Sequence, residues 1–235
     1  MLGMEASVRI EQLRLREALV LLDQALASKP RNEMKDRLLI NKARALEFLG
    51  HYEEAIETLQ QMAPDLGKGD PRLNWLRRFT WMANLGHLER YGEAEEKLPE
   101  LQALTARLGN ALDGVRVRWL AGRIAAGLGR RQESLETLSQ VREEFASRGI
   151  AYDTAQANLE LAVLYLEAGQ NAAVKALARQ MAPIFRAQGV HQGALAALQL
   201  FRDAAEREAL TLDLARRLAA YLQRARYNPE LRFEA

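Results

Sequence analysis

The side chains with the most evident chemistry in this sequence are arginines and tryptophans that recur in three successive stretches of the chain. Arginine presents a planar pair of donors to a carboxylate, and tryptophan presents a rigid, amphipathic surface. Both residue types dominate the energetics of protein interfaces. The set that we select as a candidate binding surface consists of Arg37, Asn41, Arg44, Trp75, Arg78, Arg116, Trp119 and Arg123.

The same side chains also have a purely structural interpretation, and the sequence leaves both interpretations open. Trp75, Trp81 and Trp119 would then be wedges in the core. The arginines would pair with glutamates on neighbouring helices, as charged residues on helical surfaces commonly do.

Residues suited to catalysis or metal binding are scarce. The chain has no cysteine and three histidines, His51, His87 and His191, none of which has a second histidine four residues away. Thiolate ligands, disulfides and helical zinc pairs are therefore excluded. The string Gly67-Lys68-Gly69-Asp70 lacks the preceding strand and the Ser or Thr after the lysine that a phosphate loop requires, so we interpret it as a linker. We expect no metal, no cofactor and no enzymatic activity.

A repeat of about 40 residues organises the elements that must position the candidate surface. The string Gln61-Met62-Ala63-Pro64 returns as Gln180-Met181-Ala182-Pro183. Within each repeat, rows of small and apolar residues are spaced by three and four, as on one face of a helix. These rows are Ala18, Ala55, Ala94, Ser134 and Val174; Leu22, Leu59, Leu98, Leu138 and Ala178; and Ala43, Met82, Gly122 and Ala162.

Each repeat is therefore predicted to be a helix, a tight turn and a second helix. Glycines mark most of the turns because they tolerate the left-handed conformation that ends a helix. These glycines are Gly50, Gly109, Gly129, Gly149, Gly169 and Gly189, whereas the third unit has Glu89-Arg90-Tyr91-Gly92. The predicted helices are 5–13, 15–28, 33–49, 52–63, 71–88, 92–108, 112–128, 131–148, 152–168, 171–188, 191–208 and 212–226.

Two features compete with this assignment. The segment 115–119 alternates like a strand, but Val115, Trp119 and Gly122 continue a helical face. Pro99 and Pro183 fall inside second helices, where proline removes a backbone donor. We expect kinks or short breaks at these two prolines.

The pattern resembles tetratricopeptide repeats. The resemblance is carried by Gly50-His51-Tyr52-Glu53-Glu54-Ala55, by Arg90-Tyr91-Gly92-Glu93-Ala94, and by Pro30 and Pro64 near the closing proline. It covers about residues 8–188, and 152–226 is similar to the end of bacterial multi-repeat proteins of this family. The period exceeds the family's usual 34 residues, so the chain resembles the long-repeat variant found in sensor arms of bacterial regulators. Some members hold a carboxylate with Lys and Asn, but Asn41 has no matching lysine here.

Composition and charge narrow the partner classes. The net charge is +2, and no apolar run approaches the roughly 20 residues of a membrane span. The start of the chain lacks the features of a secretory signal. Four arginines on 212–226, Arg216, Arg217, Arg224 and Arg226, could reach only a few phosphates. We expect a cytoplasmic protein with neither a membrane nor a nucleic-acid partner.

The sequence thus predicts an all-α, right-handed α-solenoid over residues 1–235, with first helices lining its concave side. Its parts are a partial unit 1–30, units of about 33–69, 70–109, 110–149 and 150–189, and a capping helix pair 190–227. The predicted function is a non-enzymatic scaffold or sensor that binds a protein or peptide, with acidic residues, on the concave face. The alternative is a regulatory arm that controls a separate effector enzyme or transcription regulator. The short first helix also suggests an open N-terminal end through which copies could self-associate.

Overall fold

The computed structural model describes residues 2–12, 14–62, 70–187, 192–226 and 230–234, with the backbone alone for 182–187 and 192. Within these ranges the chain forms twelve helices and no strand, so the all-α prediction is confirmed. It folds as two compact units, residues 1–120 and 121–235. Gly189, Pro64, His191 and the linker 67–69 lie outside the described residues. The single continuous array stays a prediction.

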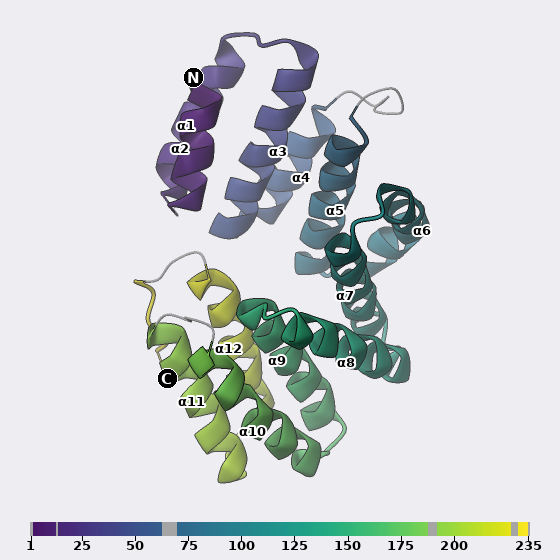
Figure 1. Cartoon of the computed structure of the whole chain (residues 1–235), viewed down its shortest axis with the longest axis vertical. Helices are drawn as coiled ribbons and strands as arrows, with labels where there is room; N and C mark the ends of the chain where they lie inside the picture. Colours follow the sequence, from purple (N-terminus) through teal and green to yellow (C-terminus); the bar gives the residue numbers. More distant parts are fainter. Residues whose placement is uncertain (1, 13, 63–69, 188–191, 227–229, 235) are drawn as a thin grey trace. The chain divides into compact units, whose positions relative to one another are not determined.

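Unit 1 is a stack of helical hairpins (Figure 1). In each hairpin the two helices pack together, and the first helices of successive hairpins, α1, α3 and α5, also contact one another in order. A hairpin cannot bury its apolar face alone, and stacking supplies the core. The helices are α1 (Leu2–Glu11), α2 (Leu15–Ala27), α3 (Asn32–Leu49), α4 (Tyr52–Gln60), α5 (Pro71–His87), α6 (Tyr91–Leu108) and the first part of α7 (Ala111–Gly127).

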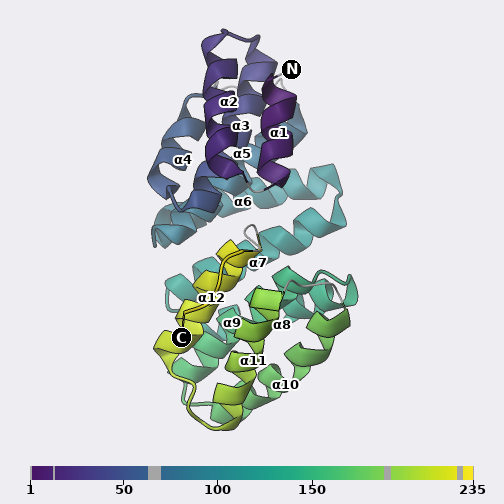
Figure 2. The same cartoon turned by 90° about the vertical axis from the view of Figure 1, so that its left-hand side faces the viewer.

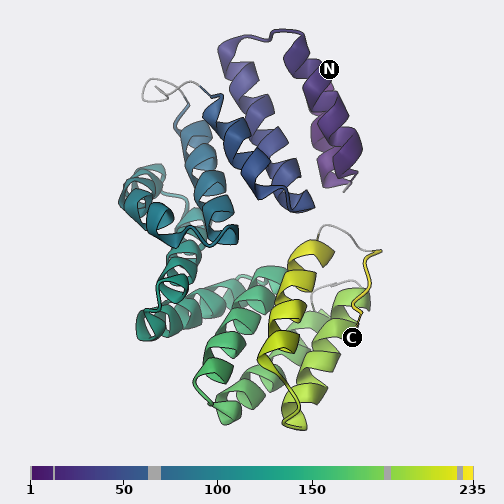
Figure 3. The ribbon, with the colours of Figure 1, turned by 180° about the vertical axis from the view of Figure 1, so that it is seen from behind.

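Unit 2 begins within α7 and ends differently from a regular stack. Its last helix folds back and packs along α9, as the views in Figures 2 and 3 also show. In unit 1 the neighbour of a first helix is the next first helix, whereas here the second helix of the terminal hairpin takes that place. The helices are α8 (Arg131–Ser147), α9 (Ala151–Glu167), α10 (Asn171–Ala187), α11 (Gln192–Glu206) and α12 (Leu212–Ala225).

The predicted rows of small and apolar residues form the core of both units. All members of the first row are at most 2% exposed. Leu98 is the exception in the second row, being half-buried, because α6 buries Leu101 and Leu104 instead. A methyl group on Gly122 would lie 2.9 Å from Leu138 Cδ2, and the Gly122 carbonyl accepts a 2.8 Å hydrogen bond from Ser134 Oγ. Gly122 therefore lets the end of α7 approach α8 closely.

Most turns follow the predicted chemistry, but Lys29, Glu89 and Glu208 take the left-handed conformation without being glycine. Gly50, Gly109, Gly129, Gly149 and Gly169 all have positive φ angles, as the C-terminal turn of a helix requires. In the third unit the corresponding position is taken by Glu89, with φ of 58°. This region is costly for a residue with a Cβ.

Of the two features that compete with the helix assignment, segment 115–119 is helical as predicted, whereas the prolines do not break their helices. Segment 115–119 lies within α7, so the helical assignment is confirmed. The expected breaks at Pro99 and Pro183 are absent, because α6 and α10 run through both positions as single helices. In α6 the apolar residues Leu101 and Leu104, which follow Pro99, are buried, and this packing outweighs one lost backbone bond.

Each unit contains a buried aspartate near the start of a first helix, and its ion pair joins that helix to another one. Asp113 in α7 and Asp153 in α9 each have side chains that are 2% exposed. Asp113 pairs with Arg72 of α5, and Asp153 pairs with Arg226 at the end of α12. A buried carboxylate is stable only when it is paired and hydrogen-bonded. The second pair, with the 2.8 Å contact of Arg216 and Glu167, fastens α12 to both ends of α9.

Gly122→Leu should destabilise unit 2, because its side chain would have to displace Leu138 or separate α7 from α8. Overpacking of this kind costs about 1–3 kcal/mol. Thermal unfolding of the full chain measures the effect. Gly92→Ala is the matched control, since a methyl group there meets nothing within 4 Å. Equal melting temperatures for the two variants would contradict the close approach.

Glu89→Gly should raise the stability of the chain by about 0.5–1 kcal/mol, because glycine relieves the left-handed backbone at a modest cost in chain entropy. Chemical denaturation measures the change. Glu89→Ala keeps the strained backbone and should give no gain. A gain that is the same for both variants would show that the glutamate side chain, and not its φ angle, is responsible.

Arg226→Gln should cost about 2–3 kcal/mol, since it leaves the Asp153 carboxylate buried without its partner. The double variant Asp153→Asn/Arg226→Gln should lose less than Arg226→Gln alone. Arg224→Gln, which removes an exposed contact to the Ala220 carbonyl, is the control and should stay within about 0.5 kcal/mol of the wild type. If Arg226→Gln is no worse than this control, the buried pair does not fasten α12.

Candidate functional site

Three of the selected residues form one stripe on α3, and two of them connect α3 to its neighbours. Arg37, Asn41 and Arg44 are spaced by four and three residues and so share a helical face. Arg37 donates to Glu33 Oε1 and to Asp70 Oδ2, both at 3.2 Å. Asn41 Nδ2 donates to Ser7 Oγ of α1 at 3.2 Å. These contacts fit the structural interpretation of both side chains.

Arg44 differs from the other two residues of the stripe. Its guanidinium lies 5.8 Å from the centre of the Phe48 ring, one turn further along α3. Within the described part of the chain, no carboxylate pairs with it. The side chain is half-buried, so its cationic end is held beside an aromatic ring and stays accessible.

Two adjacent arginines occupy the neighbouring helix α5. Arg78 Nε donates to Asn74 Oδ1 at 2.9 Å, and its guanidinium pairs with Glu100 of α6. This hydrogen bond holds the pKa of the Glu100 carboxyl below its usual value. Arg77 lies 6.0 Å from the Trp81 ring, and burial, with the charge of Arg78, lowers its pKa. The two adjacent positive charges on α5 are partly offset by Asp36 and by Glu100.

Trp75 is placed wrongly by the sequence prediction. It is 1% exposed, so it does not belong to an open surface. Its Nε1 donates to Thr105 Oγ1 of α6 at 2.8 Å, and its ring stacks on Phe79 at 4.9 Å. The guanidinium of Arg72 covers the ring at 4.5 Å. Trp75 points between α5 and α6 and joins them, which is the wedge role that the alternative interpretation gave it.

The remaining selected residues lie on α7, which both units share. Arg116 Nη1 is 3.9 Å from Asp113 Oδ1, and Trp119 is half-buried; both belong to unit 1. Arg123 lies in unit 2, where its Nε is 3.5 Å from Glu160 Oε1 of α9. The structure thus brings the α3 and α5 residues to adjacent helices within one unit.

The arginines of α12 are mostly engaged within unit 2. Arg216 and Arg226 pair with Glu167 and Asp153 of α9. Arg217 Nη1 lies 3.9 Å from Asp213 Oδ2, and Arg217 Nη2 donates to the backbone carbonyl of Glu234 at 2.5 Å. Among the described residues, only Arg224 of this group has no acidic partner. Its Nε lies 3.4 Å from the Ala220 carbonyl oxygen of the same helix.

Sequence reasoning missed the buried aspartates and the aromatic partners of the arginines. Asp113 and Asp153 stand 40 residues apart at the same place in two repeats, and this periodicity could have revealed them. Phe48 and Trp81 each follow an arginine by four residues, Arg44 and Arg77, which is the helical spacing of a contacting pair.

The described ranges contain neither a cluster of metal-binding side chains nor a membrane-spanning helix. No group of three or more His, Asp or Glu side chains there is arranged to hold a metal ion. None of the helices described is both long and apolar enough to span a bilayer.

Comparison with known proteins places the N-terminal part of the chain in a family. The tetratricopeptide repeat family model matches residues 9–76, which run from α1 into α5. No curated protein matches the chain. Repeats of this family generally mediate binding between proteins. Residues 9–76 therefore match tetratricopeptide repeats, and the rest of the described chain is built from helical repeats.

Proposed function

We propose that this chain is a non-enzymatic module that binds a protein or peptide partner with an acidic segment on the α3–α5 surface. We define this surface by Arg37, Asn41 and Arg44 of α3 and by Arg77, Arg78 and Trp81 of α5. The observation that carries the proposal is Arg44, which is half-exposed, lies 5.8 Å from the centre of the Phe48 ring and is paired with no carboxylate of the described residues. The match of 9–76 to a family of protein-binding repeats supports the location.

The chemistry of the surface favours a carboxylate ligand. Arg44 and Arg77 each lie beside an aromatic ring, Phe48 and Trp81, on two helices that contact one another. A cation–π contact restrains a guanidinium, so that less rotamer freedom is lost when it binds a carboxylate. The contact of Arg37 with Glu33 is exposed, and exposed pairs contribute at most about 1 kcal/mol. A partner carboxylate can therefore exchange with Glu33 at little cost.

The proposed role is a scaffold or sensor in a larger assembly. As a sensor, the chain would act as a regulatory arm that changes the state of a partner enzyme or transcription regulator on binding. Arg116 and Trp119 of α7, and Arg123 of unit 2, remain predicted contacts of the partner.

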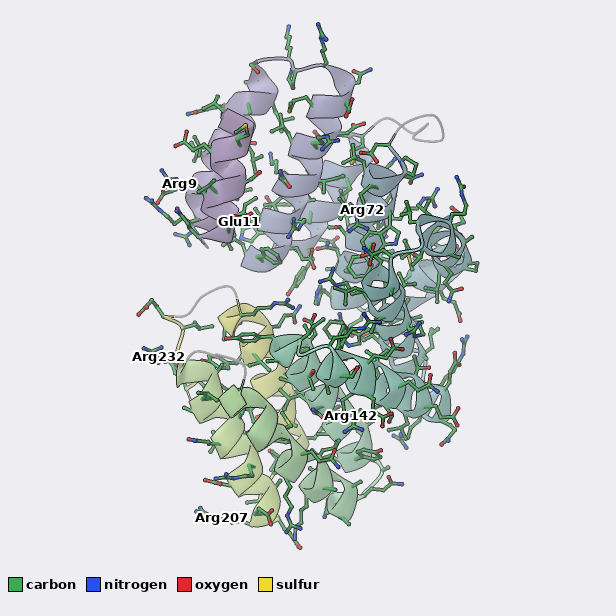
Figure 4. All side chains as sticks on the ribbon, viewed as in Figure 1. Arg9, Glu11, Arg72, Arg142, Arg207 and Arg232 are labelled. Carbon is green, nitrogen blue, oxygen red and sulfur yellow. The ribbon has the colours of Figure 1, made fainter. Side chains whose placement is uncertain are left out.

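The test is affinity capture of the tagged full chain from its native cells, followed by mass spectrometry, with three forms of the bait. The wild type should retain a stoichiometric protein partner. Arg37→Glu/Arg44→Glu reverses two charges of the α3 stripe and should lose that partner while keeping the wild-type melting temperature. Arg207→Glu, which changes an exposed arginine after α11 in unit 2 (Figure 4), should retain it.

Two results would contradict the proposal. Capture of the same partner by Arg37→Glu/Arg44→Glu would place the interface elsewhere on the chain. The absence of any stoichiometric partner from all three baits would contradict the role as a binding module.

A further inference from the structure

The segment 230–234 lies against α12. Tyr221 Oη donates to the backbone carbonyl of Leu231 at 3.0 Å. Arg217, one turn earlier on α12, donates from Nη2 to the backbone carbonyl of Glu234 at 2.5 Å. Burial raises the pKa of Tyr221, so its hydroxyl stays protonated and able to donate. Both hydrogen bonds are accepted by backbone carbonyls of the segment.

Phe233 occupies the space between the same two side chains. Its ring meets that of Tyr221 at 5.4 Å between centroids and an interplanar angle of 71°, an edge-to-face contact. The guanidinium of Arg217 lies 5.5 Å from the centre of the Phe233 ring. Edge-to-face and cation–π contacts both favour an aromatic ring at this position over an aliphatic side chain. Tyr221 and Arg217 thus form an aromatic site as well as a pair of donors.

Gly193, near the start of α11, makes room for this arrangement. A methyl group on Gly193 would lie 2.9 Å from Tyr221 Oη and 3.1 Å from the Leu231 carbonyl oxygen. The backbone of the segment could not approach a side chain at this position. Three residues from two helices therefore accommodate the same short stretch of backbone.

The segment itself is held weakly. None of residues 230–234 is buried, and Arg232, labelled in Figure 4, is exposed. Segments with little buried area open at low free-energy cost. Because the donors bond to backbone carbonyls, another chain with an aromatic residue in register could replace the segment.

We propose that Gly193, Arg217 and Tyr221 form a second binding site, for an extended peptide of a partner protein, which residues 230–234 occupy in cis. The peptide carries an aromatic residue at the position of Phe233, and its backbone carbonyls take the places of those of Leu231 and Glu234. This site lies in unit 2 and is independent of the α3–α5 surface. The segment is autoinhibitory, because a tethered ligand has an effective concentration in the millimolar range. A partner's apparent affinity falls with the fraction of open sites.

The test is fluorescence anisotropy with a labelled peptide of the sequence of residues 230–235. The full chain and a truncated form that ends at Pro229 are compared, and thermal unfolding checks that both are folded. The truncated form should bind the peptide saturably and at least tenfold more tightly than the full chain. A peptide with Phe233→Ala should bind the truncated form at least fivefold more weakly. Arg217→Gln in the truncated form should have a similar effect.

A second variant covers the case in which truncation impairs folding. Phe233→Ala in the full chain weakens the hold of the segment and should increase binding of the unchanged peptide. Absence of saturable binding by the folded truncated form, or equal binding of the two peptides, would overturn the proposal. If the truncated form does not fold, absence of increased binding by Phe233→Ala would overturn it.

Discussion

The close approach of paired helices is the constraint on which the rest of this structure depends. It needs small residues where the helices meet, such as Ala18, Ala55 and Ala94, all of which are fully buried. Once each hairpin is closed in this way, its remaining apolar face can be covered only by the next hairpin. The first helices then lie next to one another, so α3 and α5 present polar side chains together. The α3–α5 surface is thus a consequence of packing at positions remote from it.

The end of the chain solves the same packing problem by another route. In unit 2, α12 covers α9 and is fastened to it by Arg226 and Arg216. Arg216 and Arg226, which could have bound phosphates, are therefore paired with carboxylates of the same unit. Arg217 makes different contacts, because its guanidinium donates to a backbone carbonyl and lies over the Phe233 ring. That combination is what a peptide site requires.

The helices could be predicted almost entirely from the sequence, and the binding surface only in part. Rows of small residues and turn glycines are local signals, and they placed most helix ends within a few residues. The local sequence pattern does not predict whether a side chain on a first helix points to the core or to the surface. Trp75 and Arg78 are both on α5, yet Trp75 is buried against Thr105 of α6 and Arg78 remains partly exposed. The return of α12 onto α9 was missed because the 40-residue period fades after α10, and pairing between distant segments leaves no periodic trace.

The account rests on Arg44 as an available cation beside Phe48, and arginine-specific footprinting tests it most directly. The full chain is modified with phenylglyoxal, alone and with its captured partner bound, and the extent of modification at each arginine is measured by mass spectrometry. The account predicts that the partner protects Arg44 and leaves Arg207 as reactive as in the free chain. Unchanged modification of Arg44 in the complex would contradict it.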